Sequence, residues 1–313
     1  MITWQYIVGI LLAMTATSIF NLCPVLQKDE LDKMKEVSMN NIWASVKMMF
    51  SDRKWVLGLI LGVFGGIPYT IAVIWTGISV VQPLMNFGFI VLVIIAKKML
   101  NETLSISAKV AIGMMILMPI AITLANVSNP VNDITQLPTQ LALVIFVVVV
   151  LIIAVITLFL GKKFPTLYAL STGFFFACGA YSVQFVMSML AFSGYNIFTD
   201  IPLVISLIFV DPRVSLILFG VVCIAVFNAV AGYVMQIGLQ RVAASKFNPI
   251  QQTLNNLATV LGGILVFGQF IGNWAFYLCG LGFGIIGMII LGKYQIPSSA
   301  TPISPAELQK EKQ

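Results

Sequence analysis

Amide side chains recur at helical spacing along residues 248–259, and amides can bind small polar solutes. The stripe consists of Asn248, Gln251, Gln252, Asn255, Asn256 and Thr259. Residues three and four apart share one face of a helix, so most of these side chains point to the same side. An amide that faces lipid without a hydrogen-bond partner is costly, so the stripe must face protein or water. Two interpretations stay open: a polar cavity that binds a solute, or interhelical hydrogen bonds that only hold the helices together.

A second pair of amides earlier in the chain favours the cavity. The residues around Pro83 align with those around Pro249, and each copy has two amides four residues apart, the first directly before the proline: Gln82 and Asn86, then Asn248 and Gln252. Amides at equivalent positions of a repeat are expected to face one another across its symmetry axis. The other candidates for the lining of this cavity are polar residues of other predicted helices: Tyr69, Gln184, Asn228 and Gln236.

The residue types that support most enzyme chemistry are missing from the predicted membrane interior. The chain has no His, and its 11 carboxylates lie outside the predicted helices or at their edges. A buried proton relay is therefore disfavoured, and so is tight binding of a dehydrated divalent ion, which prefers charged oxygen ligands. We predict no enzymatic activity and no cofactor, and no metal ligand can be assigned. The 4 cysteines fall in apolar runs without a CxxC pair, which is typical of buried apolar side chains.

The composition is that of an all-α integral membrane protein. The chain is 59% hydrophobic and 9% charged, with a mean hydropathy of +1.02, whereas about a quarter of the residues of a soluble domain are charged. A helix needs roughly 20 apolar residues to cross the hydrocarbon layer. About nine stretches meet this length: 3–26, 55–76, 79–97, 106–126, 140–161, 166–191, 214–238, 248–267 and 272–292.

The basic residues predict the orientation of these helices. Every second connection holds nearly all of the 17 Lys and Arg residues, and Arg213 is the only one in the other connections. Basic loops stay cytoplasmic, so we expect the N-terminus outside and the C-terminus inside, most simply in a plasma membrane. The net charge of +6 follows from basic loops beside anionic lipid and calls for no nucleic-acid partner.

The alignment of the two halves predicts inverted repeats. Equivalent positions are an odd number of helices apart, so one copy is turned over relative to the other, a construction that places a transported solute between the copies. We expect a first repeat, a connecting loop with a linker helix, a second repeat and a cytoplasmic tail, at 1–126, 127–165, 166–292 and 293–313. Two segments are expected to lie on the membrane surface rather than to span it: 38–50 on the inner face and 201–210 on the outer face.

Several short motifs resemble the drug/metabolite transporter superfamily. An apolar helix follows Gln82-Pro83-Leu84, and Asn101-Glu102-Thr103-Leu104 precedes a helix that contains Ile112-Gly113. The layout is most similar to the NIPA-type magnesium transporters and to EamA-like proteins, with nine spans, a basic segment after the first, and a proline near the start of helices three and eight. This chain departs from that branch at Gly66, where the branch has an acidic residue, and at Gln269, near an expected Glu.

The resemblance implies a secondary transporter that works by alternating access, with magnesium or another divalent cation as a substrate. The amides by themselves predict a small polar or cationic solute. A metabolite or drug exporter of the same superfamily is the alternative within this class, and a non-transporting membrane scaffold or sensor is the alternative from another class. The expected partners are a small-molecule or ion substrate and the lipid bilayer, and the sequence does not predict an oligomeric state.

Overall fold

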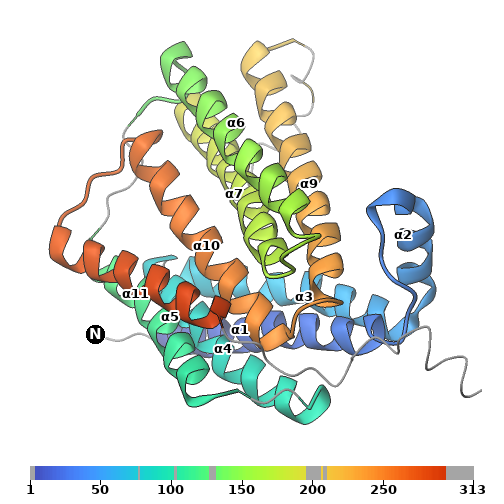
Figure 1. Cartoon of the computed structure of the whole chain (residues 1–313). Coiled ribbons are helices and arrows are strands. Elements are labelled where there is room, and N and C mark those ends of the chain that lie inside the picture. Colours follow the sequence, from blue (N-terminus) through green and yellow to red (C-terminus); the bar gives the residue numbers. More distant parts are fainter. Residues whose placement is uncertain are drawn as a thin grey trace, which may run out of the picture. The chain divides into compact units, whose positions relative to one another are not determined.

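The structure, a computed structural model, describes residues 4–76, 78–101, 104–126, 132–194, 206 and 210–293. Within these ranges the elements are ten α-helices and one short 3-10 helix, so the predicted all-α fold is confirmed there (Figure 1). The chain divides into two compact units. Unit 1 comprises Met1–Ile120, Gln236–Pro249 and Ile285–Gln313, and unit 2 comprises Ala121–Met235 and Ile250–Gly284.

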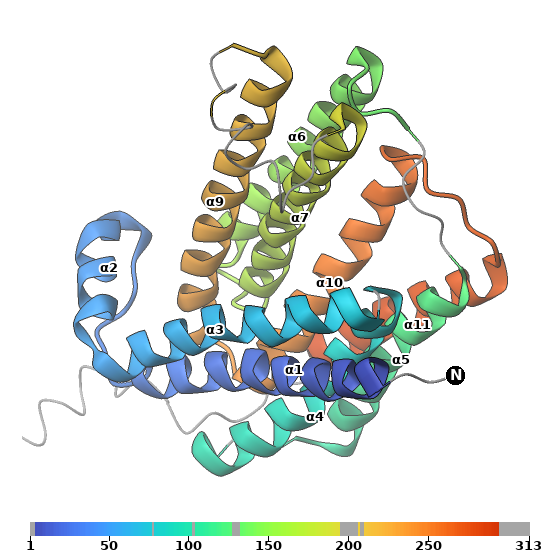
Figure 2. The same cartoon turned by 180° about the vertical axis from the view of Figure 1, so that it is seen from behind.

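Unit 1 is built on a long N-terminal helix. Its elements are α1 (Trp4–Leu31), η1 (Met39–Asn41), α2 (Ile42–Ser51), α3 (Arg53–Thr76), α4 (Ile78–Met99) and most of α5 (Ile106–Leu124). Helix α1 contacts both α3 and α4, and Figure 2 shows α3 and α1 running alongside one another. The approach of α4 to α1 requires a glycine, because a Cβ on Gly88 would lie 2.1 Å from both Thr17 Oγ1 and Asn21 Nδ2. The Thr17 hydroxyl also donates to the Met85 carbonyl oxygen over 2.6 Å, which fixes the register of the two helices.

Helix α1 continues beyond its predicted end at residue 26, to Leu31. Lys28 lies 3.2 Å from Asp32, and Lys33 lies 2.9 Å from Asp29. Opposite charges four residues apart stabilise a helix, so the charged residues extend α1 where the hydropathy alone predicted a loop.

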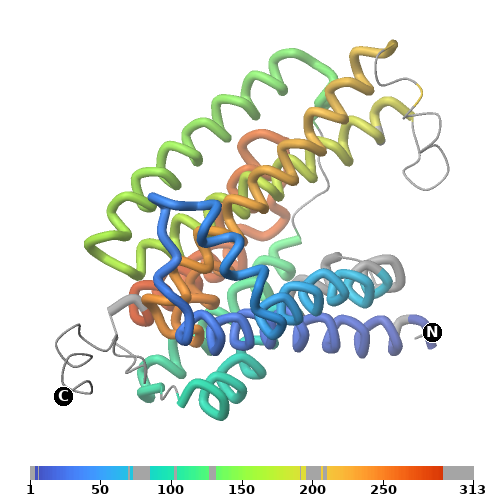
Figure 3. Tube along the Cα trace, turned by 90° about the vertical axis from the view of Figure 1, so that its right-hand side faces the viewer, coloured from blue at the N-terminus to red at the C-terminus, as the bar shows by residue number. Residues whose placement is uncertain are grey.

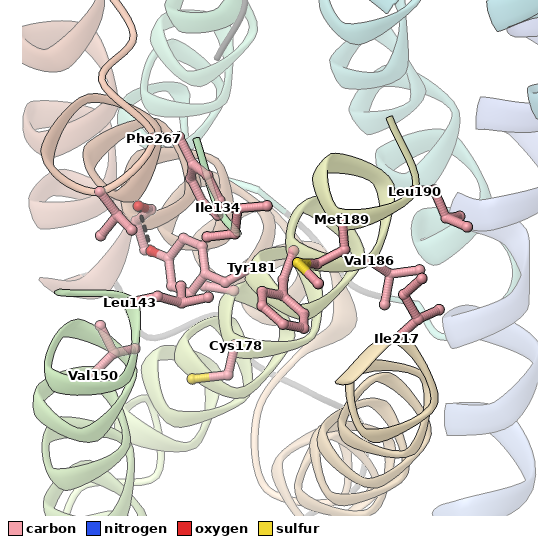
Figure 4. Packing of buried hydrophobic residues seen from close by; sticks show 14 residues of the cluster. Ile134, Leu143, Val150, Cys178, Tyr181, Val186, Met189, Leu190, Ile217 and Phe267 are labelled. Carbon is pink, nitrogen blue, oxygen red and sulfur yellow. Dashed lines mark hydrogen bonds between the residues drawn. The ribbon is translucent and has the colours of Figure 1, made fainter. Parts of the chain in front are cut away.

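Unit 2 holds the other apolar helices. They are α6 (Leu137–Leu160), α7 (Leu167–Ser193) and the larger parts of α9 (Pro212–Leu239), α10 (Ala244–Leu265) and α11 (Trp274–Lys293). Helices α6 and α7 lie side by side (Figure 3), and the Ser171 hydroxyl donates to the Ala154 carbonyl oxygen over 2.8 Å. Tyr181 lies in the core of unit 2 with Cys178 and Phe267 nearby, and its hydroxyl donates to the Ala258 carbonyl oxygen of α10 (Figure 4).

Six helices of the described part are long and apolar enough to cross a membrane: α1, α5, α6, α7, α9 and α11. Helix α6 leaves Val144, Ile145 and Ile152 more than half exposed at the surface of the protein. A continuous apolar surface of this kind is unfavourable in water and stable against lipid. The chain is therefore a multi-pass membrane protein. Helices α3, α4 and α10 coincide with the three other predicted spans. The crossing of all nine helices, the orientation of the termini and the inverted repeat remain predictions.

The predicted surface segment 38–50 forms η1 and α2. The other predicted surface segment, 201–210, and the tail after residue 293 lie outside the described residues, apart from Ser206 and Val210. All four cysteines are free. Cys23 and Cys178 are buried as expected, whereas Cys223 is half-buried and Cys279 is exposed. The expectation of burial was wrong for Cys279, because it lies on the outward face of an apolar helix, where a thiol needs no protein cover.

Candidate functional site

Asn248, near the start of α10, is a buried amide without a hydrogen bond. Its side chain is 6% exposed, and among the described residues neither its nitrogen nor its oxygen has a partner. The next residue, Pro249, has no backbone N–H to offer the amide oxygen. A buried polar group that lacks a partner costs about 1–3 kcal/mol. Native structures contain few such groups, and each of them calls for an explanation.

Asn86, in the middle of α4, has a hydrogen bond at only one of the two polar atoms of its amide. Its side chain is fully buried, and Nδ2 donates to the Met115 carbonyl oxygen of α5 over 2.9 Å. Its Oδ1 has no partner among the described residues. The contact of Gly88 with α1 and the hydrogen bond from Thr17 to Met85 hold this part of α4 in place. Asn86 is therefore positioned by rigid packing, and one acceptor remains for another group.

The second part of α10, which belongs to unit 2, has the rest of the amide stripe. Gln251 is buried, Gln252 donates to Asn256 Oδ1 over 3.3 Å, and Thr259 is half-buried. Asn255 Oδ1 is buried and has no partner among the described residues. Helix α7 packs against this part of α10, since a Cβ on Gly173 would lie 2.8 Å from the Gln251 carbonyl oxygen. Residues 251, 255 and 258 share a helix face, so Asn255 is on the side that α7 contacts.

The remaining predicted site residues have different surroundings. Gln184 donates to Ser188 Oγ over 3.1 Å, and the exposed Asn228 donates to the Ile224 carbonyl oxygen of its own helix over 2.8 Å. Tyr69 is half-buried with its ring against Phe20. The side chain of Gln82 lies outside the described residues.

Gln236 is also buried, but its amide is used by the protein. Gln236 Oε1 accepts from Trp55 Nε1 over 3.1 Å, and Nε2 donates to Gln27 Oε1 over 3.1 Å. Gln236 and Asn248 both belong to unit 1. They are buried to a similar degree, with 4% and 6% of their surface exposed. One amide has two partners among the described residues and the other has none, which makes the two residues a natural pair for comparison.

Sequence reasoning missed the polar network around Gln236. We call it the α1–α9 clasp and define it as Gln27, Lys28, Trp55, Gln236 and Leu239. Lys28 is 1% exposed, and its Nζ donates to the Leu239 carbonyl oxygen over 2.6 Å. Just outside the clasp, Gln240 Nε2 donates to the Leu31 carbonyl oxygen over 2.9 Å, and Arg241 pairs with Glu36. The signal in the sequence was a polar pair, Gln27-Lys28, at the end of an apolar run, but its partner lies far along the chain.

The described residues contain no group of three His, Cys, Asp or Glu side chains that could hold a metal ion together. The candidate side chains are neutral amides: Asn86 and Asn248 in unit 1, and, taken separately, Asn255 in unit 2. Such groups accept hydrogen bonds from a polar solute or ligate a cation through oxygen, and they offer no acid, base or nucleophile.

Fold and site together define a class, the multi-pass, all-helical membrane proteins with buried amides. Comparisons with protein-family models, with curated proteins and with solved structures find no match for this chain.

Proposed function

We propose that this protein is a secondary transporter whose solute binds the unit 1 amides Asn248 of α10 and Asn86 of α4. The proposal depends on one observation, the burial of Asn248 with both polar atoms free of partners among the described residues. A residue that only held helices together would be expected to have a bonded amide, as Gln236 has. A residue that binds a passing solute must instead keep its hydrogen-bonding groups available.

The chemistry of the site favours an uncharged polar or cationic solute. Amide oxygens attract cations and donors. Among the described residues of unit 1, two of the three buried side-chain atoms without a partner are amide oxygens, Asn86 Oδ1 and Asn248 Oδ1. Magnesium is the cation that the resemblance to NIPA-type transporters suggests. A dehydrated divalent ion prefers carboxylate ligands, so magnesium is a weaker candidate than a monovalent or organic cation or a neutral solute.

The wider proposal includes nine spanning helices in two inverted repeats, with the N-terminus outside and alternating access to the amides. The alternation of basic connections and the coincidence of nine helices with the predicted spans support this arrangement. A drug or metabolite exporter of the same superfamily would use the same amides on a larger solute. A membrane scaffold or sensor would bind no solute there at all.

The experiment compares wild type, Asn248→Leu and the control Gln236→Leu by thermal unfolding in detergent. Each protein is heated alone and with a panel of Mg²⁺, monovalent cations, organic cations and neutral polar metabolites. A ligand that binds only the folded state at about 100 times its Kd adds about 2.7 kcal/mol of stability. We expect at least one panel member to raise the Tm of the wild type.

The two variants should then behave differently. Asn248→Leu should lose the ligand effect and have an unliganded Tm no lower than the wild type, because leucine removes a buried amide that has no partner among the described residues. Gln236→Leu should keep the ligand effect but unfold at a lower temperature, since Trp55 and Gln27 lose their partner. The proposal fails if no panel member stabilises the wild type, or if Asn248→Leu retains the ligand effect.

A further inference from the structure

Helix α2 is a surface helix of unit 1, and side chains cap its N-terminus and that of the preceding η1. The Ser38 hydroxyl accepts from Asn40 N–H over 3.2 Å at the start of η1, and Asn41 Oδ1 accepts from Ala44 N–H over 3.2 Å at the start of α2. Side chains of this type at a helix N-terminus stabilise the helix because they accept hydrogen bonds from its first N–H groups. Helix α2 stands crosswise to α1 and α3 in Figures 1 and 2. Helix α1 is long and apolar enough to cross a membrane, so a helix crosswise to it is oriented as an interfacial helix would be.

One face of α2 is buried against the protein, and the other, which we call the open face, is exposed. Ser45 and Met49 are buried, and the Ser45 hydroxyl accepts from Ser38 N–H over 3.1 Å. On the open face Trp43 is 85% exposed and Phe50 is 56% exposed, with the exposed Lys47 between them at spacings of four and three residues. Aromatic rings beside a lysine are typical of a helix seated in the headgroup region of a bilayer.

The charges around α2 decide which lipid this face prefers. The segment from Lys28 to Lys54 contains five carboxylates, and each of them is engaged: Asp29 and Glu30 with Lys33, Asp32 with Lys28, Glu36 with Arg241, and Asp52 with the N–H groups of Lys54 and Trp55. The hydrogen bonds to Asp29 and Glu30 raise the pKa of Lys33, so these carboxylates face a cation that stays charged.

Three exposed cations of this segment, Lys35, Lys47 and Arg53, have no described carboxylate within ion-pair distance. Lys35 precedes η1, whereas Lys47 lies in α2 and Arg53 follows it. Arg53 begins α3 directly after α2, so its cationic group is close in sequence to the aromatic face. The open surface at α2 therefore combines two exposed aromatic rings with two cationic groups whose charge the protein does not neutralise.

We propose that the open face of α2 binds the headgroups of anionic phospholipids, with Trp43 and Phe50 among the acyl chains and Lys47 and Arg53 at the phosphates. A basic side chain near an anionic leaflet contributes about 1 kcal/mol, which corresponds to a preference of about fivefold per residue. This property is independent of the amide site and of the proposed transport.

The test uses the full-length protein in nanodiscs and follows the fluorescence of Trp43, obtained as the difference between wild type and Trp43→Phe. Brominated phosphatidylglycerol and brominated phosphatidylcholine, which quench tryptophan on contact, are compared at the same mole fraction. We expect the anionic lipid to quench Trp43 several-fold more effectively, and added salt to reduce the difference because salt screens exposed charges.

Two variants identify the source of the preference. Lys47→Gln/Arg53→Gln should abolish the difference between the two lipids but leave quenching by both. The control Lys162→Gln/Lys163→Gln, which removes two exposed basic residues between α6 and α7, should retain the difference. Equal quenching of the wild type by both lipids would overturn the proposal, since the face would then be interfacial without charge preference. Absence of quenching by either lipid would also overturn it, because another protein surface or water would then cover the face.

Discussion

Lys28 Nζ lies 2.6 Å from the carbonyl oxygen of Leu239, the last residue of α9. The lysine is 1% exposed and also contacts Asp32 over 3.2 Å. The last carbonyl groups of a helix have no partner within the helix and carry partial negative charge, so a cation placed there is stabilised by both effects. This contact joins the end of α1 to the end of α9, and within the same clasp Gln236 of α9 also donates to Gln27 of α1.

Replacement of Lys28 by methionine should destabilise the protein. The methionine keeps the volume but leaves the Leu239 carbonyl oxygen without this donor, and a hydrogen bond to a charged group is worth about 1.5–3 kcal/mol. We expect a loss of that size in the free energy of unfolding, measured by denaturant titration in detergent. Lys33→Met is the control, because Lys33 forms exposed ion pairs worth at most about 1 kcal/mol. Equal effects of the two substitutions would contradict a special role of the buried lysine.

A methyl group on Gly88 should separate α4 from α1. The added Cβ would lie 2.1 Å from Thr17 Oγ1 and Asn21 Nδ2, so the helices must move and the hydrogen bond from Thr17 to Met85 must lengthen. Overpacking of this kind costs about 1–3 kcal/mol, and the shift should show as a lower Tm for Gly88→Ala. In the control Gly113→Ala the new methyl group has nothing within 4 Å, and its Tm should equal or exceed that of wild type. A harmless Gly88→Ala would show that the two helices pack less closely than described.

The two ends of α6 should lie on opposite sides of the membrane. The predicted orientation places Lys163, after α6, inside and Gln136, before α6, outside. Single cysteines at these positions in intact cells are treated with an impermeant thiol reagent, and we expect only Gln136→Cys to react. Reaction of Lys163→Cys from outside would reverse the orientation deduced from the basic connections.

The positions of the helices could be predicted from the sequence because the hydrocarbon layer sets the length of an apolar run. The end of α1 could not be predicted in this way. Lys28 and its charged neighbours are typical of a loop by hydropathy, and the ion pairs that keep them helical become visible only in the structure. The same limit applies to the amides. Gln236 and Asn248 have the same side-chain chemistry and both lie in predicted helices, so spacing alone cannot show that one amide has two partners and the other has none among the described residues.

If Asn248 faces a path for an aqueous solute, a cysteine at this position should react with a water-soluble thiol reagent. Asn248→Cys is placed in a chain whose native cysteines are replaced by alanine, and is treated with a small charged methanethiosulfonate in membranes. We predict that it reacts, and that a compound that raises the Tm of the wild type slows the reaction. Gln236→Cys, at a position that is equally buried but bonded within the clasp, should stay unmodified. If Asn248→Cys is as unreactive as Gln236→Cys, the amide is a structural residue and the proposed transport site does not exist at α10.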